Sequence, residues 1–454
     1  MEQKLEKKYG LMTAIAMVIG IVVGSGVFFK AEYVLNATGG NLPIGILAWI
    51  IGGLVMVICA YMFSILAERY DSVGGLLGYA EAVAGKRYGY YIGWFLATVY
   101  TPAITSVLAW VSARYTCVLI GWDITGGECM TLAGLYLILV YAMNELAPIV
   151  AGRFQISTTV IKLIPLIAMA VVGSISGLIS GTTVENFTKV VSQDVTGNPL
   201  FSAVVATVFA YEGWIVATSI NAEIKDSKKN LPRALIIGSL IVVAVYIFYY
   251  IGLAGAVPTT ALMEGGEAGA KLAFQNIFGQ VAGTLIFVFI IISCLGTLNG
   301  LMLGCTRSLY ALAARGLGPC PKKLGQVDCT TDMPANSSVA GLLLCAFWLM
   351  YFYGANLTAS WFGPFSFDTS ELPIVTLYGG YIPILIMMML RETELSTFKR
   401  YVMPLLAVVS CVFMVVAACM AHKMAVVYYL IIFAVIMMIG LPYMPKRGSD
   451  LGRE

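Results

Sequence analysis

The sequence has little charge and almost no histidine. Only 11% of its 454 residues are Asp, Glu, Lys or Arg, whereas soluble proteins carry about 25%. Hydrophobic residues make up 59% of the chain, and a soluble protein with that composition would expose apolar patches that aggregate. The scarcity of charge therefore excludes an ordinary soluble protein. It predicts an all-α integral membrane protein, because helices satisfy their own backbone groups in lipid.

The lack of clustered reactive side chains argues against an enzyme. A metal centre or a catalytic pair needs neighbouring His, Cys, Asp or Glu side chains, but the chain has one histidine, His422, and dispersed acids. Its ten cysteines form no Cys-X-X-Cys pair, and several lie in apolar runs as small buried residues do. Only Cys117 and Cys129, on either side of one polar loop, leave a disulfide open. We expect no cofactor, no metal, no nucleic acid and no obligate protein partner.

Long apolar runs are abundant instead. Twelve stretches are long enough to cross about 30 Å of hydrocarbon; they lie at 11–35, 44–66, 88–120, 130–150, 154–180, 200–222, 233–257, 276–313, 337–354, 369–390, 401–421 and 424–444. The charged start, residues 1–8, and the length of the first run do not fit a cleavable leader. The links between the runs are short, so we expect no soluble domain between the spans.

The basic residues give the twelve spans an orientation. Of the 27 Lys and Arg residues, 21 fall on the side of the termini, two (Arg114 and Lys162) fall inside spans, and four fall on the opposite side. Cytoplasmic loops carry an excess of Lys and Arg. The sequence therefore predicts a multi-pass membrane protein with both termini in the cytoplasm.

Small residues interrupt the first span. Gly24, Ser25 and Gly26 lie about midway through it, where a helix in lipid would favour leucine. Close packing against another helix, through Gly20 and Gly24, would explain the glycines if they stood alone. The alternative is an unwound segment, which survives at membrane depth only where it lines a cavity enclosed by protein.

A second interruption in the sixth span favours the unwound segment. Glu212 and Gly213 lie near its middle, and a carboxylate there costs about 2.5–3.5 kcal/mol. Because the two breaks are five spans apart, the chain can contain two repeats of opposite orientation, and paired breaks of this kind indicate the substrate site of a transporter. We expect a first repeat at 1–180 (spans 1–5), an inverted second repeat at 181–391 (spans 6–10), and two peripheral spans with a cytoplasmic tail at 392–454.

The two breaks together predict a site for a zwitterion. A half-helix that begins near Val27 presents free N–H groups and the positive end of its dipole, which favour a carboxylate. The half-helix that ends around residues 209–212 presents free carbonyl groups, which favour an ammonium. A molecule with both groups on one carbon, an α-amino acid, fits between them.

Three motifs in order resemble a known family. The stretch "GIVVGSGVFF" resembles the GSG(I/V)F signature of the amino acid–polyamine–organocation superfamily. The stretch "FAYEGWIVATSINAEIKDSKKNLPRAL", residues 209–235, resembles the sixth span and following loop of its L-type amino acid transporter branch, and more narrowly of bacterial serine/threonine exchangers. The stretch "LGTLNGLMLGCTRSLYALAARGLGP", residues 295–319, is similar to the eighth span of that family.

The resemblance implies a LeuT-type fold of twelve transmembrane helices, with discontinuous helices 1 and 6 and substrate between spans 1, 3, 6, 8 and 10. It implies that backbone groups around the two breaks hold the substrate, and that Phe209 closes over it as an outer gate. The substrate-binding residues expected on this basis are Gly24, Ser25, Gly26, Val27, Phe209, Ala210, Glu212 and Gly213.

A lysine in the fifth span bears on the driving force. Lys162 lies about nine residues past the cytoplasmic start of that span; it can snorkel to the interface or face a cavity and take part in function. In the family that the chain resembles, a lysine at this place occupies the Na⁺ site of sodium-coupled members. We expect Ser293 beside it in span 8, and Tyr246 in span 7 as a further gate or a partner of Lys162. Transport is therefore predicted to be independent of Na⁺.

These observations predict a secondary active transporter that exchanges neutral L-amino acids by alternating access. Proton-coupled symport stays open, because a proton could leave the buried ammonium of Lys162 during the cycle, and so does exchange of polyamines or amines. The role of Glu212 also stays open: it can accept the charge of a basic substrate, carry a proton, or bond to its own unwound backbone. Capping of the tenth span accounts for Asp368 and Glu371.

Overall fold

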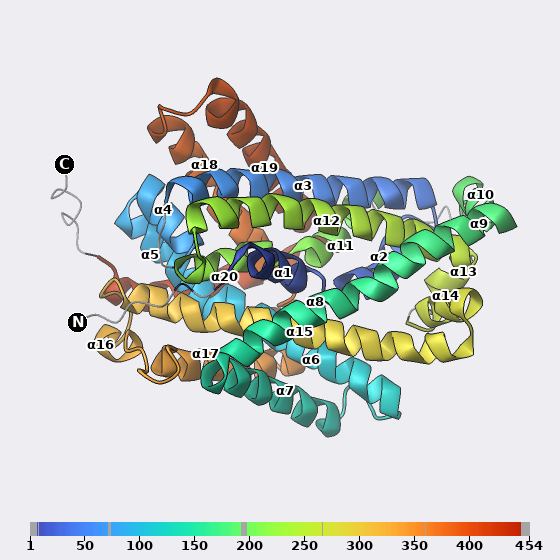
Figure 1. Cartoon of the computed structure of the whole chain (residues 1–454), viewed down its shortest axis with the longest axis horizontal. Coiled ribbons are helices and arrows are strands. Elements are labelled where there is room, and N and C mark those ends of the chain that lie inside the picture. Colours follow the sequence, from blue (N-terminus) through green and yellow to red (C-terminus); the bar gives the residue numbers. More distant parts are fainter. Residues whose placement is uncertain are drawn as a thin grey trace.

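The computed structural model describes residues 7, 9–70, 74–191, 198–265, 267–358 and 360–445, without the side chains of Phe29, Phe209, Glu267 and Ala268. Every element in this part of the chain is helical, and the single backbone bridge, Tyr9 to Ile224, belongs to no sheet (Figure 1). The prediction of an all-α protein is confirmed for these residues.

The helices follow one another in an order close to the predicted spans. In chain order they are α1 (Leu11–Val22), α2 (Gly26–Ala37), α3 (Leu42–Arg69), α4 (Leu76–Ala84), α5 (Lys86–Phe95), α6 (Thr101–Ile120), α7 (Gly127–Leu146), α8 (Pro148–Ala168), α9 (Ser174–Ser180), α10 (Thr182–Thr188), α11 (Pro199–Tyr211), the 3₁₀ helix η3 (Trp214–Glu223), α12 (Ser227–Ala256), α13 (Thr259–Gly265), α14 (Glu267–Phe278), α15 (Gln280–Ala313), α16 (Pro321–Leu324), α17 (Ala335–Phe352), α18 (Leu372–Arg391), α19 (Met403–His422) and α20 (Met424–Gly440).

Ten continuous helical segments in the described part of the chain are long and apolar enough to span a membrane. They are Leu42–Arg69, Lys86–Ile120, Gly127–Leu146, Pro148–Ser180, Ser227–Ala256, Gln280–Ala313, Ala335–Leu357, Leu372–Arg391, Phe398–His422 and Met424–Tyr443. The pair α1 and α2, bent by 44° at their junction, makes an eleventh if it is counted as one span. The sixth predicted span contains the short helix α11 followed by η3, so a total of twelve spans stays a prediction.

The long helices pack side by side around α1. Helix α12 packs along α3, α15 packs along α6, and α8 crosses α15 diagonally (Figure 1). Helix α1 contacts α12, α8 and α15, and eight of its twelve residues are buried. The interrupted first span thus runs through the middle of the bundle, where α8, α12 and α15 can supply polar groups to its backbone.

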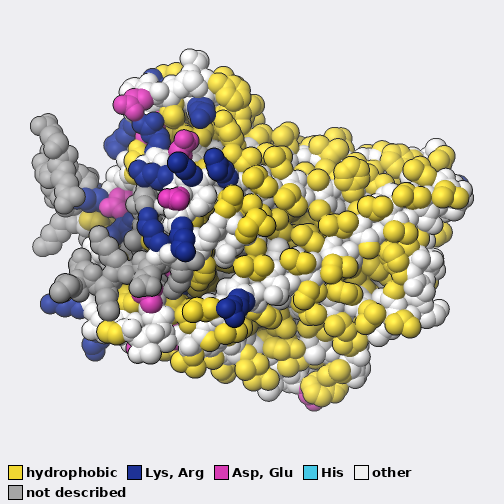
Figure 2. Space-filling view, in the orientation of Figure 1, with side chains coloured by type: hydrophobic (Ala, Val, Ile, Leu, Met, Phe, Trp, Pro, Cys, Tyr) yellow, Lys and Arg dark blue, Asp and Glu magenta, His cyan; other side chains and the backbone are white. Residues whose placement is uncertain are grey.

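Apolar side chains cover most of the surface that Figure 2 shows, and Lys and Arg gather at one end of it. We call this the basic end of the bundle. Large apolar side chains point outward along the long helices, as at Ile138, Ile175 and Leu343. A surface of this kind is stable in lipid and explains why the chain needs so little charge.

No disulfide forms in the structure. All ten cysteines are free thiols, so the bridge that the sequence left open between Cys117 and Cys129 is absent here. Both side chains are buried, as expected for small apolar residues.

A buried ion pair joins η3 to α15 near the basic end. The Arg307 guanidinium donates two hydrogen bonds of 2.8 Å to the carboxylate of Glu223, and the two side chains are only 1% and 0% exposed. The chain ahead of α1 adds backbone contacts, since the amide of Tyr9 donates to the carbonyl of Glu223 at 2.9 Å. Such a bidentate pair fixes the orientation of both helices.

Replacement of Arg307 by methionine should destabilise the protein strongly. The substitution removes the bidentate guanidinium from the buried carboxylate of Glu223, a loss of about 3–5 kcal/mol in the free energy of unfolding. The melting temperature of the detergent-purified variant measures it. The control is Lys189→Met, because Lys189 pairs with Glu185 at an exposed site where an ion pair contributes about 0–1 kcal/mol. Equal melting temperatures for the two variants would contradict this account.

Candidate functional site

The first break separates α1 from α2. Helix α1 ends at Val22 and α2 begins at Gly26, with Ser25 at its N-cap position. The amide of Phe28 returns to the chain by donating to the carbonyl of Ser25 at 3.0 Å. The amides of Ser25, Gly26 and Val27 precede the first intrahelical bond of α2, so they point out of the helix without an acceptor in it.

The second break separates α11 from η3. Helix α11 ends at Tyr211, and the backbone of Gly213 is left-handed with φ of 101°. A side chain is excluded there on two grounds, because this conformation strains other residues and because a Cβ atom would lie 2.8 Å from Cγ2 of Ile21. The carbonyl groups in the last turn of α11 are therefore left without intrahelical donors.

The two breaks touch each other. A Cβ atom on Gly26 would lie 2.7 Å from Cα of Ala210, so the start of α2 packs directly on the last turn of α11. This contact brings the N–H end of one half-helix next to the carbonyl end of another. It is the arrangement that the sequence predicts for a carboxylate and an ammonium on one small molecule.

A small cavity of about 30 Å³ lies beside the two breaks. It is lined by Ile21, Val22, Gly24, Ser25, Gly26, Ile104, Leu108, Glu212, Gly213, Thr297, Leu301 and Ile374. Two buried oxygen atoms of this lining, Oγ of Ser25 and Oε2 of Glu212, have no hydrogen-bond partner. Buried polar groups are rarely left unpaired in proteins, so these two atoms can accept a hydrogen bond from a molecule in the cavity.

Lys162 lies on the other side of the first break. Its ammonium, on α8, donates to the carbonyls of Gly20 at 2.8 Å and Val23 at 2.6 Å, and to the hydroxyl of Thr297 at 3.2 Å. The side chain is fully buried, so the snorkelling alternative is wrong. A positive charge here also stabilises the carbonyl end of α1.

Ser293 and Tyr246 bind the same stretch of backbone. The hydroxyl of Ser293 reaches the carbonyls of Val23 at 3.2 Å and Gly24 at 3.1 Å, and the hydroxyl of Tyr246 donates to the carbonyl of Val22 at 3.0 Å. With Lys162 they occupy the carbonyls on the α1 side of the break. The amides on the α2 side stay open, so the break favours an anionic group.

A tyrosine in the turn just ahead of α6 donates a hydrogen bond to Glu212. The hydroxyl of Tyr100, in the π-helical turn Leu96–Tyr100 ahead of α6, donates to Oε1 of Glu212 at 2.6 Å. The carboxyl is 7% exposed. Its bonding to a distant side chain, rather than only to its own backbone, was not expected from the sequence.

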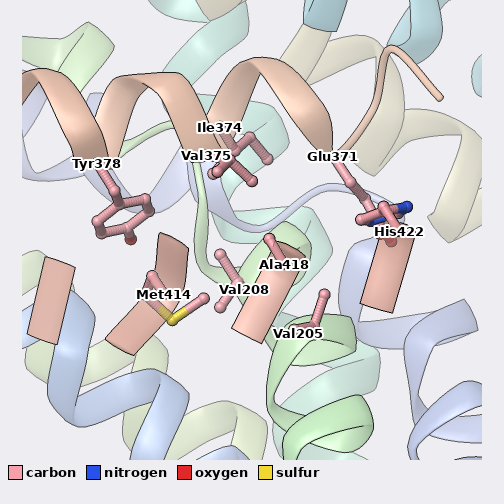
Figure 3. A pocket seen from close by; sticks show the side chains of 9 residues that line it. All are labelled: Val205, Val208, Glu371, Ile374, Val375, Tyr378, Met414, Ala418 and His422. Carbon is pink, nitrogen blue, oxygen red and sulfur yellow. Dashed lines mark hydrogen bonds and ion pairs between the residues drawn. The ribbon is translucent and has the colours of Figure 1, made fainter. Parts of the chain in front are cut away.

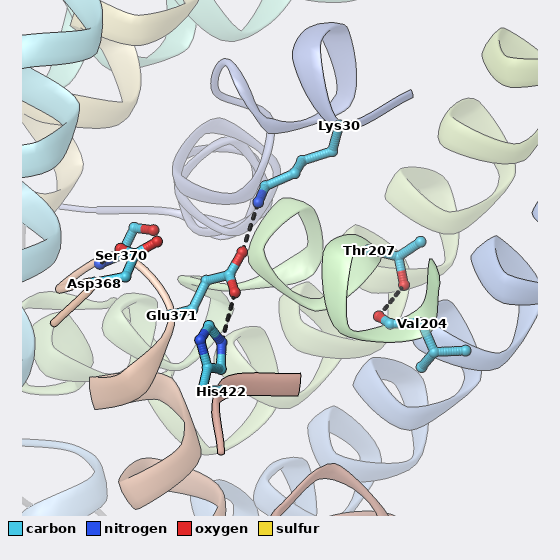
Figure 4. A network of polar contacts seen from close by, with 7 residues as sticks. All are labelled: Lys30, Val204, Thr207, Asp368, Ser370, Glu371 and His422. Carbon is cyan, nitrogen blue, oxygen red and sulfur yellow. Dashed lines mark hydrogen bonds and ion pairs between the residues drawn. The ribbon is translucent and has the colours of Figure 1, made fainter. Parts of the chain in front are cut away.

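A second polar cluster lies on the α2 side of the first break. Figure 4 shows Glu371, ahead of α18, between Lys30 of α2 and His422 of α19. Its two carboxylate oxygens lie 2.6 Å from the Lys30 ammonium and 2.9 Å from Nε2 of His422. Burial would raise the pKa of Glu371, but the positive charge of Lys30 and the hydrogen bond to His422 outweigh it and hold the pKa at about 2. The carboxylate therefore stays charged at neutral pH.

Glu371 lies at the N-cap position of α18, where a carboxylate interacts favourably with the helix dipole, as the sequence suggested. Its side chain makes no capping hydrogen bond and binds Lys30 and His422 instead, which the sequence did not predict. A small apolar space separates this cluster from Tyr378, with Glu371 and His422 at one end and the Tyr378 ring at the other (Figure 3). The cluster joins α2 to α19 through the residue that precedes α18.

Sequence reasoning found the breaks and Lys162 but missed several partners. Thr297 falls in the motif of span 8, four residues after Ser293, and its hydroxyl bridges the carbonyls of Gly20 and Val23 at 3.0 Å each. Tyr100 and the Lys30 cluster carried no local signal. The predicted gate, the side chain of Phe209, lies outside the described residues.

Comparisons with known proteins agree with this geometry. A family model described as "Amino acid permease" matches residues 9–441. The serine/threonine exchanger SteT of Bacillus subtilis (strain 168) is 32% identical over 323 residues, which cover 71% of this chain and 72% of that protein. The human cystine/glutamate transporter is 23% identical over 337 residues, 73% of this chain and 66% of that protein.

The human large neutral amino acids transporter small subunit 2 is 25% identical over 345 residues, which cover 73% of this chain and 62% of that protein. The chain thus spans slightly less than two thirds of these human relatives. The family match over most of the chain fits the two broken helices and the polar cavity between them. The chain belongs to the amino acid permease family of the amino acid–polyamine–organocation superfamily of transporters.

Proposed function

We propose that this permease exchanges neutral L-amino acids across the plasma membrane by alternating access, without Na⁺. One observation carries the proposal: the start of α2 packs on the last turn of α11 at Gly26 and Ala210, and residues of both breaks, among them Ser25, Gly26 and Gly213, line one cavity. The amides would bind the substrate carboxylate. The carbonyls of Phe209, Ala210 and Glu212 would bind its ammonium, next to the turn at Gly213.

Two observations support the substrate class. The groups that would bind the substrate are uncharged backbone amides and carbonyls, and the related transporters are named for amino acids. Serine/threonine, cystine/glutamate and large neutral amino acids appear in the names of the related transporters. All of these substrates share an α-amino acid group, which the two half-helix ends fit. We propose that residues 1–180 and 181–391 form the two inverted repeats around this site, with 392–454 peripheral, and that the chain acts without an obligate protein partner.

Sodium independence rests on the position of Lys162. Its ammonium already fills a group of oxygens, the carbonyls of Gly20 and Val23 and the hydroxyl of Thr297, of the kind that Na⁺ would need as ligands. A second cation placed there would be repelled in a medium of low dielectric constant. Proton-coupled symport stays the alternative, since Lys162 and Glu212 are both buried titratable groups beside the breaks.

Transport should require the α-carboxylate and a counter-substrate. Purified protein in liposomes loaded with mixed amino acids should take up a labelled neutral amino acid, while empty liposomes should take up little. A decarboxylated analogue of the best substrate should neither enter nor compete, because the amides of Ser25, Gly26 and Val27 would lose their ligand. Equal uptake into empty and loaded vesicles would rule out obligatory exchange, and transport of the analogue would favour an amine exchanger.

Lys162→Ala should reduce turnover more than binding. Without the ammonium, the carbonyls of Gly20 and Val23 lose their main donor and the break loses its fixed shape, so we expect kcat to fall by at least about tenfold with a smaller change in KM. Uptake by the unchanged protein should be equal in Na⁺ and choline buffers. Lys189→Ala, an exposed lysine, is the control. Normal transport by Lys162→Ala, or a requirement of the unchanged protein for Na⁺, would contradict the assignment.

We propose that the basic end faces the cytoplasm, in line with the positive-inside rule. Cys320 and Cys329 are exposed thiols between α15 and α17, on the side of the basic end. In intact cells of a Cys419→Ser variant, a membrane-impermeant maleimide should leave both unlabelled until the membrane is opened. A cysteine at the exposed position of Asp123, between α6 and α7, should react from outside at once. The reverse pattern would show the opposite orientation.

A further inference from the structure

Only one of the two carboxyl oxygens of Glu212 accepts a hydrogen bond from a side chain. Oε1 accepts the hydrogen bond from Tyr100 at 2.6 Å, and Tyr378 and the amide of Gly213 also lie close to the carboxyl. Nevertheless Oε2 has no partner in hydrogen-bonding geometry, and no basic side chain pairs with Glu212 in the part of the chain that the structure describes. A buried acceptor in this state costs free energy until a donor reaches it.

Glu212 lines the cavity, so a ligand in the cavity lies beside this residue. Glu212 is the only residue with an ionisable side chain in that lining. The wall away from the breaks is apolar and consists of Ile104, Leu108, Leu301 and Ile374. A ligand side chain that enters the cavity would therefore meet hydrocarbon and one strong hydrogen-bond acceptor.

The two groups on Cα of an amino acid have other partners. Under the proposed function, the open amides at the start of α2 bind the carboxylate, and the carbonyl end of α11 binds the ammonium. Neither group needs the side chain of Glu212. What is left to satisfy Oε2 is a donor on the side chain of the substrate.

We propose that Oε2 of Glu212 reads the substrate side chain and selects small amino acids that carry a hydroxyl or amide donor. The inference rests on the proposed function and adds the substrate class to it. Tyr100 acts as a positioning residue, since its bond to Oε1 fixes the carboxyl and leaves Oε2 to the cavity. A substrate without a donor leaves Oε2 buried and unpaired, and sites built to bond a hydroxyl discriminate strongly against analogues that lack it.

The residues around Glu212 favour a substrate side chain with a neutral donor over one with a cationic donor. Phenolic donors already share the charge of the carboxylate, and the rest of the wall is apolar, so it offers no polar groups to solvate a side-chain ammonium. A hydroxyl or an amide needs only the single acceptor that Oε2 supplies. Ornithine, which is long and cationic, tests the other possibility.

The test compares matched substrates with the full-length protein in liposomes. Threonine and valine have nearly the same shape, and serine and alanine differ by the hydroxyl. We expect the transport efficiency, kcat/KM, to be about 10- to 100-fold higher for threonine than for valine, which is the factor expected for a buried acceptor left unpaired. O-methylthreonine, which keeps the oxygen but has lost the donor, should be a poor substrate.

Variants then assign the effect to Glu212. Glu212→Leu should bring the threonine-to-valine ratio close to one, and Tyr100→Phe should lower the ratio without a change in melting temperature. Glu185→Gln, at an exposed acid outside the site, should leave the ratio unchanged. If Glu212→Leu does not fold, the comparison of threonine with valine and O-methylthreonine in the unchanged protein tests whether transport requires a donor on the substrate side chain.

The opposing outcomes separate the inference from the proposed function. If threonine, valine, serine, alanine and ornithine all fail to enter, the proposed function is wrong and the inference falls with it. If amino acids are exchanged but valine equals threonine, the inference alone is wrong. A preference for ornithine would overturn both the inference and the neutral substrate class of the proposed function. An equal loss of threonine and valine transport in Glu212→Leu would also overturn the inference, since it would assign Oε2 to the shared ammonium.

Discussion

The structure depends on one constraint: in hydrocarbon, every backbone N–H and C=O needs a partner from the protein. Continuous helices meet this constraint by themselves. At residues 23–25 the regular helical bonding is interrupted, and the carbonyls on the α1 side accept hydrogen bonds from Lys162, Ser293, Thr297 and Tyr246. Three long helices, α8, α12 and α15, therefore surround α1 because its interrupted backbone requires their polar side chains.

Side chains bind the carbonyl groups of the first break but not its amides, and this asymmetry determines which groups of a ligand the cavity can bind. Side chains fill the carbonyl half of the first break, while the amide half at Ser25, Gly26 and Val27 stays open. The second break has the opposite polarity, with the carbonyl end of α11 beside the cavity. The contact between Gly26 and Ala210 holds the start of α2 against the end of α11. The two helix breaks therefore form one site, with amides for a negative group and carbonyls for a positive group.

Much of this was predictable, since each predicted feature is anomalous in its local sequence. Gly24 to Gly26, Glu212 beside Gly213, and Lys162 are residues that hydrocarbon disfavours, and the structure places all of them around one point. What escaped prediction are pairings between distant residues. Tyr100 and Glu212 are 112 positions apart, and Lys30 and Glu371 are 341 apart. A tyrosine in an apolar run is ordinary, so only the fold shows which acid it meets.

The two ion pairs that join distant helices differ in how deeply they are buried. Lys30 binds Glu371 on the α2 side of the first break, and Arg307 binds Glu223 near the basic end. The side chains of the first pair are 7% and 16% exposed, whereas those of the second are 1% and 0% exposed. Separating charges at a partly exposed site costs less than separating them in a dry interior. A movement that separates Lys30 from Glu371 would therefore need less free energy than one that separates Arg307 from Glu223.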